Sequence, residues 1–198
     1  MIGTIISHYK ILEKLGEGGM GVVYKAQDLE LDRPVALKFL PHHLTANEAE
    51  EARFLQEAKA ASAINHPNVC TIHAVERADG EKFIVMEFVD GVTLRDKVQH
   101  APLKVNDALT FGIQIGEALQ EAHSKGIVHR DVKAENVMIN TKNQIKVMDF
   151  GLAKLKGSLR LTKTSSAVGT LAYMSPEQIQ GIEVDYRTDL WDGGRRVQ

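Results

Sequence analysis

The chain has a single cysteine and no long apolar run. Cys70 cannot close an intramolecular disulfide, which fits a reducing compartment, and we expect it to be buried and inert. No stretch reaches the ~18 consecutive apolar residues that a transmembrane helix needs, and residues 1–10 lack the basic-then-apolar pattern of a signal peptide. These absences predict a cytoplasmic protein with no membrane segment in this chain.

An excess of charge of one sign is also lacking. The 24 Lys and Arg residues face 26 Asp and Glu residues, so the formal net charge is −2. A chain this balanced has no overall field that attracts nucleic acid or an anionic membrane, and any phosphate must be bound at a local site. Hydrophobic residues make up 43% and charged residues 25%, which is typical of a globular protein and excludes disordered and collagen-like classes.

The first half of the chain has a strand-like pattern with one helix. Short apolar runs alternate with glycine over the first forty residues, which predicts strands joined by tight turns. Thr45 and Glu48 form a capping-box pattern before a predicted helix. Its apolar residues at helical spacing are Phe54, Ala58, Ala61 and Ile64. Two apolar runs, 69–75 and 83–89, flank a turn at 78–80 and predict a hairpin.

The second half begins as a helix. Apolar residues return to helical spacing from Val105 up to Lys125 and Gly126, where glycine is typical of a helix end. The residues on one side of this helix are Leu109, Ile113, Gly116 and Leu119. The natural boundary between the strand-rich and helical parts lies at residues 87–91, and small-molecule clefts tend to form at such boundaries.

A glycine-rich turn joins two of the predicted strands. It consists of Gly16, Glu17, Gly18, Gly19, Met20, Gly21, Val22 and Val23. Glycines let backbone amides approach phosphate oxygens, although a plain hairpin turn explains this motif alone equally well. The chain continues as a strand through Tyr24 and Ala26 instead of starting a helix, which argues against a dinucleotide-binding fingerprint.

Charged residues follow in an order that suits phosphoryl transfer. Lys38 ends the apolar run 35–37, and Glu57 on the next helix can pair with it, whereas a solvated strand lysine is the alternative. In the segment 129–136, Asp131 can accept the proton of an attacking hydroxyl, and Lys133 can steady the migrating charge. Asn136 offers a neutral oxygen to a divalent metal. The segment 149–151 adds the carboxylate of Asp149 as the charged metal ligand. Four such motifs in this order are not a chance match.

This ordered set, with Ser175-Pro176-Glu177, resembles the eukaryotic-like (Hanks-type) serine/threonine protein kinases, and the residues within its motifs are most like those of the bacterial members. The resemblance runs from about Tyr9 to Trp191. It implies an α+β, bilobal fold with an N-terminal lobe at residues 1–86, a hinge at 87–91 and a partial C-terminal lobe at 92–198. The first lobe would be an antiparallel sheet plus one helix, and the second mainly helical and incomplete.

The resemblance also implies that ATP and Mg²⁺ bind between the lobes. Adenine would lie between Leu15, Val23 and Ala36 above and Met138 below, beside Met86 at the gatekeeper position. Glu87 and Val89 would bond its edge through their backbones. Asn136 and Asp149 would hold magnesium, and Lys38, Glu57, Asp131 and Lys133 would form the catalytic set. Lys133 two residues after Asp131, with Thr170 after Gly169, is similar to the serine/threonine subgroup.

The C-terminal end departs from the family. The resemblance implies that Asp189 holds the backbone of the 129–130 turn, but the tail 192–198 does not continue as an apolar helix. Glu177 lacks the arginine with which relatives pair it, which we expect to be destabilising. We therefore interpret the chain as C-terminally truncated, with an exposed apolar patch near Trp191. Ala134 in place of proline and Ser175 in place of alanine are expected to be tolerated.

Two functions stay open. The first is a protein kinase that transfers the γ-phosphate of ATP to Ser or Thr hydroxyls of protein substrates, with Asp131 as base and with a homodimer for autophosphorylation, as in many relatives. The second is a catalytically inactive truncated fragment that at most binds nucleotide or a partner protein. The filled catalytic positions favour the first, and the missing helices favour the second.

The segment between Asp149 and Glu177 is predicted to be an activation loop, with a flexible polar loop of no regulatory role as the alternative. Its candidate phosphorylation sites are Thr162, Thr164, Ser165 and Ser166. We expect phosphate on one of them to be bound by Arg130. Mass spectrometry of protein prepared with ATP should find phosphate within this segment. Full peptide coverage without any phosphate would contradict the prediction.

Overall fold

The computed structural model describes residues 1–18, 21–41, 48–78, 80–150 and 174–194 of the chain. The contacts divide it into two compact units. The first comprises Met1–Ser62 and Thr71–Phe88, and the second comprises Ala63–Cys70 and Val89–Gln198. Among the described helices, none is long and apolar enough to cross a lipid bilayer. The expected division into lobes around a hinge at residues 87–91 stays a prediction.

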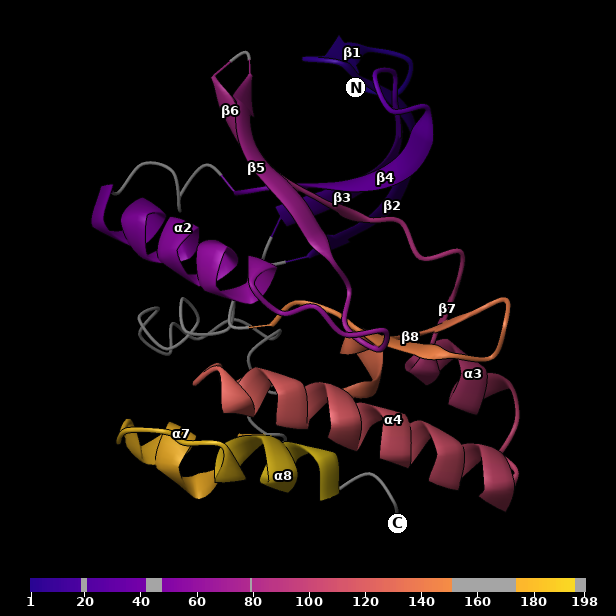
Figure 1. The fold of residues 1–198 in the computed structure, drawn as a ribbon, viewed down its shortest axis with the longest axis vertical. Coiled ribbons are helices and arrows are strands. Elements are labelled where there is room, and N and C mark those ends of the chain that lie inside the picture. Colours follow the sequence, from indigo (N-terminus) through magenta and orange to yellow (C-terminus); the bar gives the residue numbers. More distant parts are fainter. Residues whose placement is uncertain (19–20, 42–47, 79, 151–173, 195–198) are drawn as a thin grey trace. The chain divides into compact units, whose positions relative to one another are not determined.

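The first unit is built on a six-stranded antiparallel sheet (Figure 1). The strands are β1 (Ile5–Ile6), β2 (Tyr9–Gly18), β3 (Gly21–Asp28), β4 (Arg33–Phe39), β5 (Ile72–Ala78) and β6 (Glu81–Glu87). They lie in the order β1-β2-β3-β4-β6-β5, and α2 (Glu48–Ser62) contacts β5. The strands expected in the first forty residues, the helix after Thr45 and the hairpin before residue 89 are confirmed.

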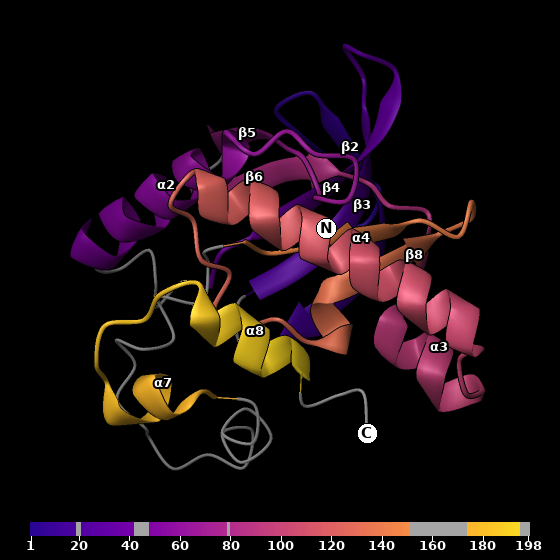
Figure 2. The same cartoon turned by 60° about the horizontal axis from the view of Figure 1, so that its bottom comes forward.

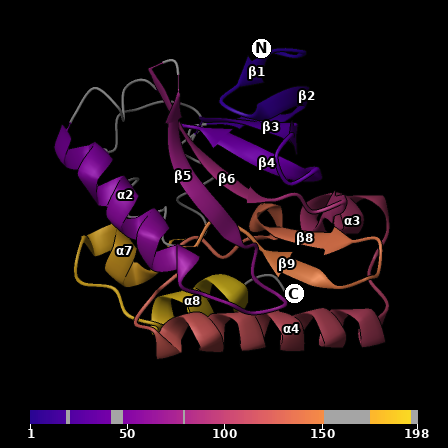
Figure 3. The same cartoon turned by 45° about the horizontal axis from the view of Figure 1, so that its top comes forward.

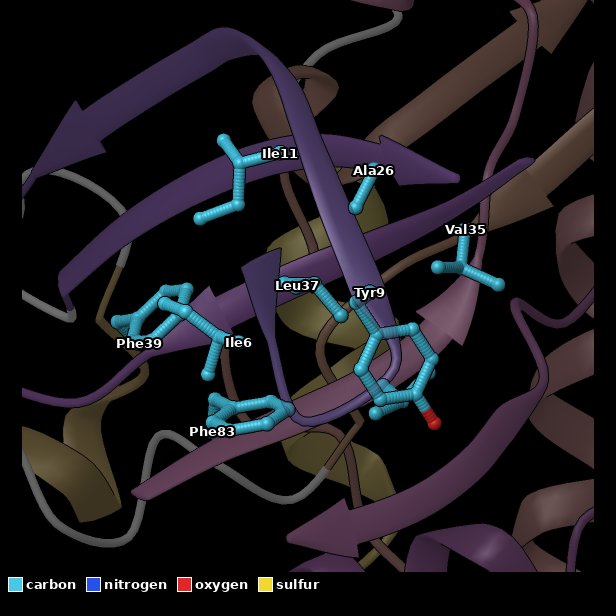
Figure 4. Close-up of a cluster of buried hydrophobic side chains, with 9 residues drawn as sticks. Ile6, Tyr9, Ile11, Ala26, Val35, Leu37, Phe39 and Phe83 are labelled. Carbon is cyan, nitrogen blue, oxygen red and sulfur yellow. The ribbon is translucent and has the colours of Figure 1, made fainter. Parts of the chain in front are cut away.

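One face of this sheet carries a hydrophobic core (Figure 4). The buried residues of the cluster are Ile6, Tyr9, Ile11, Ala26, Val35, Leu37, Phe39, Phe83 and Val85. Strand β4 contributes every second residue, Val35, Leu37 and Phe39, because alternate side chains of a strand point to the same face. The same alternation turns Ala36 and Lys38 to the opposite face of the sheet.

The second unit combines a small antiparallel sheet with helices (Figure 3). Its elements are β7 (Gly91–Thr93), α3 (Leu94–His100), α4 (Val105–Ser124), the 3₁₀ turn η1 (Ala134–Asn136), β8 (Val137–Asn140), β9 (Ile145–Val147), α7 (Pro176–Gln180) and α8 (Arg187–Gly194). The three strands lie in the order β7-β8-β9, and β9 contacts α4. Helix α8 lies beside the C-terminal end of α4 (Figure 2).

Helix α4 confirms the helix expected from Val105, and it ends at Ser124. Its buried residues are Phe111, Ala118, Leu119 and Ala122. The side that the sequence pattern singled out is only partly buried, because Leu109 and Ile113 are 61% and 63% exposed within the part of the chain that the structure describes. Near the end of the described residues, Leu190 is 61% and Trp191 39% exposed, which agrees with the expected apolar patch near Trp191, although the patch itself stays a prediction.

The segment Ala63–Cys70 joins the second unit because Asn68 connects it to β9 and α4. The Asn68 amide donates to the Ile145 carbonyl at 3.0 Å and to Gln114 Oε1 at 3.1 Å. Backbone bonds from Cys70 N to Val147 O and from Val147 N to Asn68 O extend the connection. Cys70 is buried here, as expected from the sequence.

Replacing Gly21 with alanine tests how tightly the glycine-rich turn packs on β4. The φ angle of Gly21 is 110°, and a Cβ atom there would collide with the carbonyl oxygen of Phe39. We expect Gly21→Ala to lower the free energy of unfolding by about 3 kcal/mol or more, measured by chemical denaturation. Gly80→Ala is the control, because φ is 81° but a Cβ atom would meet nothing within 4 Å. It should cost only about 1 kcal/mol, and equal losses would contradict the steric explanation.

Candidate active site

The carboxylate of Asp131 is held by two neighbours from its own loop. Lys133 Nζ lies 2.8 Å from Asp131 Oδ2, and the side chains of the two residues are 19% and 12% exposed. Asn136, the last residue of η1, donates its amide to the Asp131 carbonyl at 2.8 Å and to Asp131 Oδ2 at 3.3 Å. The loop therefore presents a nearly buried carboxylate of fixed direction beside one cation.

His129 fixes the loop from inside. Its ring is fully buried, and Nε2 lies 2.8 Å from the carbonyl oxygen of Met148. The main-chain N–H of Asp131 donates to Nδ1 at 3.3 Å. A carbonyl can only accept and an N–H can only donate, so the ring has the tautomer with its proton on Nε2. Its edge-to-face contact with Phe150, at 4.7 Å between centroids, connects the loop to the segment of Asp149.

The side chain of Asp189, on α8, binds the backbone of the same loop. Its carboxylate is fully buried and accepts the N–H of His129 at 2.8 Å and the N–H of Arg130 at 2.6 Å. His123, in the last turn of α4, places Nε2 2.7 Å from Asp189 Oδ2. The expected role of Asp189 at the 129–130 turn is confirmed, and His123 is an additional partner that the sequence patterns did not indicate.

Two residues of the site have left-handed backbone conformations without being glycine. The φ angle is 68° at Arg130 and 59° at Asp149. Such conformations cost of order 1–3 kcal/mol and persist only where surrounding contacts enforce them. Both residues adjoin the atoms to which the sequence assigns chemistry, which is where stored strain of this kind is concentrated.

Asn136 and Asp149 are the residues that the sequence predicts to bind a magnesium ion. The Asn136 amide nitrogen is directed to Asp131, so its Oδ1 is the atom that can ligate a cation. Met148 N donates to the Asn136 carbonyl at 2.8 Å, which fixes the backbone one residue before Asp149 relative to Asn136. One carboxylate and one amide oxygen, with substrate phosphates and water, form a typical Mg²⁺ site.

In the first unit, the glycine-rich turn has open space above two of its glycines. In the register of β2 and β3, Gly16 pairs with Val23 and Gly18 with Gly21. A Cβ atom at Gly16 or Gly18 would meet nothing within 4 Å, so packing within the protein does not require glycine there. Room for a ligand next to the backbone is the simplest physical reason for both residues. Gly19 and Met20 lie outside the described residues.

Lys38 and Ala36 lie on the face of β4 that is turned away from the hydrophobic core. Lys38 pairs with Val23 of β3 and Ile84 of β6, and it is only 4% exposed, which does not fit a solvated strand lysine. Ala36 is equally buried and pairs with Met86. Glu57 is a half-buried residue of α2, and its expected ion pair with Lys38 stays a prediction.

The remaining residues that the sequence predicts to bind nucleotide lie as follows. Leu15 on β2 is 46% exposed. The N–H of Glu87, at the end of β6, donates to the Thr71 carbonyl at 2.9 Å. In the second unit, Val89 is buried, and Met138 on β8 pairs with Thr93 of β7. Their roles toward adenine stay predictions.

The segment after residue 173 contains partners that the sequence analysis missed. Ser175 caps α7 in a capping box with Gln178, so serine here has a structural function and is more than a tolerated replacement. The Thr188 hydroxyl donates to Glu177 Oε1 at 2.7 Å and, with a backbone N–H, holds the pKa of Glu177 below its usual range. Glu177 therefore has a hydroxyl partner that the sequence did not indicate, and the expected destabilisation from the missing arginine stays a prediction.

Gly151, the four candidate phosphorylation sites Thr162, Thr164, Ser165 and Ser166, and the pair Gly169 and Thr170 lie outside the described residues. The proposed binding of a phosphate by Arg130 is a prediction for the same reason.

Comparisons with known proteins agree with this arrangement. A probable serine/threonine-protein kinase of Clostridium acetobutylicum is 44% identical over 196 residues, which are 98% of this chain and 30% of that protein. The serine/threonine-protein kinase PrkC of Bacillus subtilis is 40% identical over 193 residues, which are 96% of this chain and 30% of that protein. The chain thus spans about 30% of the length of these curated relatives.

The crystal structure of the Mycobacterium tuberculosis PknI kinase domain matches with a TM-score of 0.75 and 30% identity. The match covers 96% of this chain and 70% of that one. The protein kinase domain family matches residues 9–195. The resemblance and the fold expected from the motifs are thereby confirmed, and the chain belongs to the protein kinase domain family.

Proposed function

We propose that this protein binds ATP with Mg²⁺ and transfers the γ-phosphate to Ser or Thr hydroxyls of protein substrates. The observation that carries this proposal is the Asp131 carboxylate, nearly buried and held by Lys133 and Asn136. A carboxylate in that setting can accept the proton of a hydroxyl that attacks phosphorus. Lys133, 2.8 Å away, can then steady the charge that develops on the transferred group.

The first unit would bind the phosphates and the adenine. Buried Lys38 would pair with phosphate oxygens, with Glu57 as its orienting carboxylate, and the backbone at Gly16 and Gly18 would approach the phosphates closely. Because the Glu87 N–H is already used by Thr71, a contact of Glu87 with the adenine edge would use its carbonyl oxygen. Leu15, Val23, Ala36, Val89 and Met138 would supply the remaining adenine contacts.

Magnesium would be held by Asn136 Oδ1 and the Asp149 carboxylate. When bound, the ion neutralises phosphate charge and helps to orient the γ-phosphate for in-line attack. The chain's own part is to hold these two ligands, through the Met148–Asn136 backbone bond and the contact of His129 with Phe150.

The substrate class rests on the relatives and on two residue positions. The relatives at 44% and 40% identity are named serine/threonine-protein kinases. Lys133 two residues after Asp131, with Thr170 after Gly169, matches that subgroup. Protein substrates with Ser or Thr, and a second copy of the chain for autophosphorylation, are the partners that this function implies.

A catalytically inactive fragment that binds nucleotide or a partner protein is the second candidate. It is favoured by the apolar side chains that remain exposed among the described residues of the second unit, such as Leu109, Ile113 and Leu190. Exposed apolar surface of this kind marks a contact site for other protein segments or a risk of aggregation.

Substitution of the catalytic residues separates the two candidates. We expect the folded, monodisperse chain to transfer phosphate from ATP-Mg to itself and to a basic generic substrate. Asp131→Asn and Lys38→Met should each lower the rate by about a thousandfold, because they remove the base and the phosphate-binding cation. Lys10→Met, at an exposed position of β2, is the control and should keep the wild-type rate. No transfer by folded wild-type protein would favour the inactive fragment.

The role of Asp149 is tested by nucleotide binding. We expect wild-type protein to bind a fluorescent ATP analogue more tightly as Mg²⁺ is added, because Asp149 and Asn136 share the ion with the phosphates. Asp149→Asn should remove most of this Mg²⁺ dependence, with affinity in EDTA within about twofold of wild type. The same Mg²⁺ dependence in both proteins would show that Asp149 is not a ligand.

A further inference from the structure

The side chain of Gln178 connects helix α7 to the loop of Asp131. The side-chain Oε1 accepts the main-chain N–H of Ser175 at 2.8 Å, and the main-chain N–H of Gln178 donates to Ser175 Oγ at 3.3 Å. These two bonds form the capping box of α7. The Nε2 atom is not needed for the cap, and it donates to the carbonyl oxygen of Arg130 at 2.7 Å.

This third bond acts on the peptide group that precedes Asp131. The carbonyl of Arg130 and the N–H of Asp131 belong to one planar peptide unit. Gln178 binds the carbonyl end at 2.7 Å, and His129 Nδ1 accepts from the N–H end at 3.3 Å. Because both its carbonyl and its N–H are hydrogen-bonded, this peptide group cannot rotate. The orientation of the Asp131 backbone that follows it is therefore fixed as well.

Arg130 also needs support from outside its own loop. Its φ angle of 68° is unfavourable for a residue with a side chain. Both of its backbone groups are bound by side chains from the last two described helices, since Asp189 Oδ1 accepts the N–H at 2.6 Å and Gln178 donates to the carbonyl. Asp189 binds only the N–H of Arg130, and Gln178 adds the bond to its carbonyl oxygen.

We propose that Gln178 is a positioning residue for phosphoryl transfer, which acts by fixing the peptide plane between Arg130 and Asp131 and thereby aiming the Asp131 carboxylate. The proposal rests on the proposed kinase function. Gln178 follows Ser175 by three residues, so the same side chain both caps α7 and binds the loop of Asp131.

Capping of α7 is the competing explanation for this residue, and the chemistry of the side chain separates the two. Glutamate fills the same capping-box position as glutamine, because the cap uses only an acceptor oxygen. Glutamate has no donor for the Arg130 carbonyl. Gln178→Glu therefore keeps the cap and removes the bond to the loop. Ser175→Ala removes the Oγ acceptor of the cap and keeps the bond from Gln178 to Arg130.

Steady-state kinetics and thermal unfolding of the 198-residue chain test the proposal. We expect Gln178→Glu to lower kcat about tenfold, with KM for ATP within about twofold and little change in Tm. Gln178→Met, which removes all side-chain bonds without adding charge, should lower both kcat and Tm. Ser175→Ala should lower Tm and leave kcat within about twofold of wild type. The proposal is overturned by wild-type kcat in Gln178→Glu, or by kcat values that follow Tm through the three variants.

Amide hydrogen exchange gives a readout that does not depend on activity. If Gln178 fixes the loop, the peptide that contains residues 129–132 should exchange faster in Gln178→Glu than in Ser175→Ala or wild type. Equal exchange in Gln178→Glu and wild type would overturn the proposal even if no variant transfers phosphate. Absence of transfer by wild-type protein would instead count against the proposed function, so the two failures are distinguishable.

Discussion

The second unit depends on one buried carboxylate. Asp189 is fully buried, and its two oxygens face the N–H groups of His129 and Arg130 and the ring of His123. Burying a carboxylate costs several kcal/mol unless such donors surround it. Helix α8 can therefore keep Asp189 inside only when the loop and the end of α4 are in place, and the loop keeps its backbone conformation only when Asp189 is present. Three segments far apart in the sequence become one cooperative unit.

In this arrangement, the backbone of the loop that carries Asp131 is held by residues that have no proposed role in the chemistry. The left-handed backbone at Arg130 is supported by Asp189 and Gln178, which bind its N–H and its carbonyl oxygen. Asp189 accepts a hydrogen bond from the backbone of the loop. The buried ring of His129 accepts the N–H of Asp131 at Nδ1 and donates from Nε2 to the carbonyl oxygen of Met148. Preorganisation of this kind is what phosphoryl transfer requires, because positioning and electrostatics supply most of its catalysis.

The sequence predicted those features that local patterns determine. Strands, the main helices and the order of the catalytic motifs follow from spacings within a few residues. The buried side of α4 was not predicted. Apolar residues at helical spacing include both Leu109, which is exposed, and Phe111, which is buried, and only the packing partners decide which side of the helix is covered. The bonds of Gln178 to Arg130, 48 residues apart, and of Thr188 to Glu177, 11 residues apart, arise only after the chain has folded.

The glycine-rich turn shows why a motif does not separate folding from function. Gly21 is required by the fold, because its φ angle is 110° and the Phe39 carbonyl occupies the place of a Cβ atom. Gly16 and Gly18 have φ angles outside the left-handed region, and a Cβ atom there would meet nothing within 4 Å. Among the described glycines of the turn, Gly16 and Gly18 are therefore not required by packing, and the proposed approach of a phosphate chain to the backbone would explain them. The sequence presents the four glycines of the turn alike. The structure assigns Gly21 to the architecture of β3 and β4, whereas the role of Gly16 and Gly18 beside a ligand stays a prediction and Gly19 lies outside the described residues.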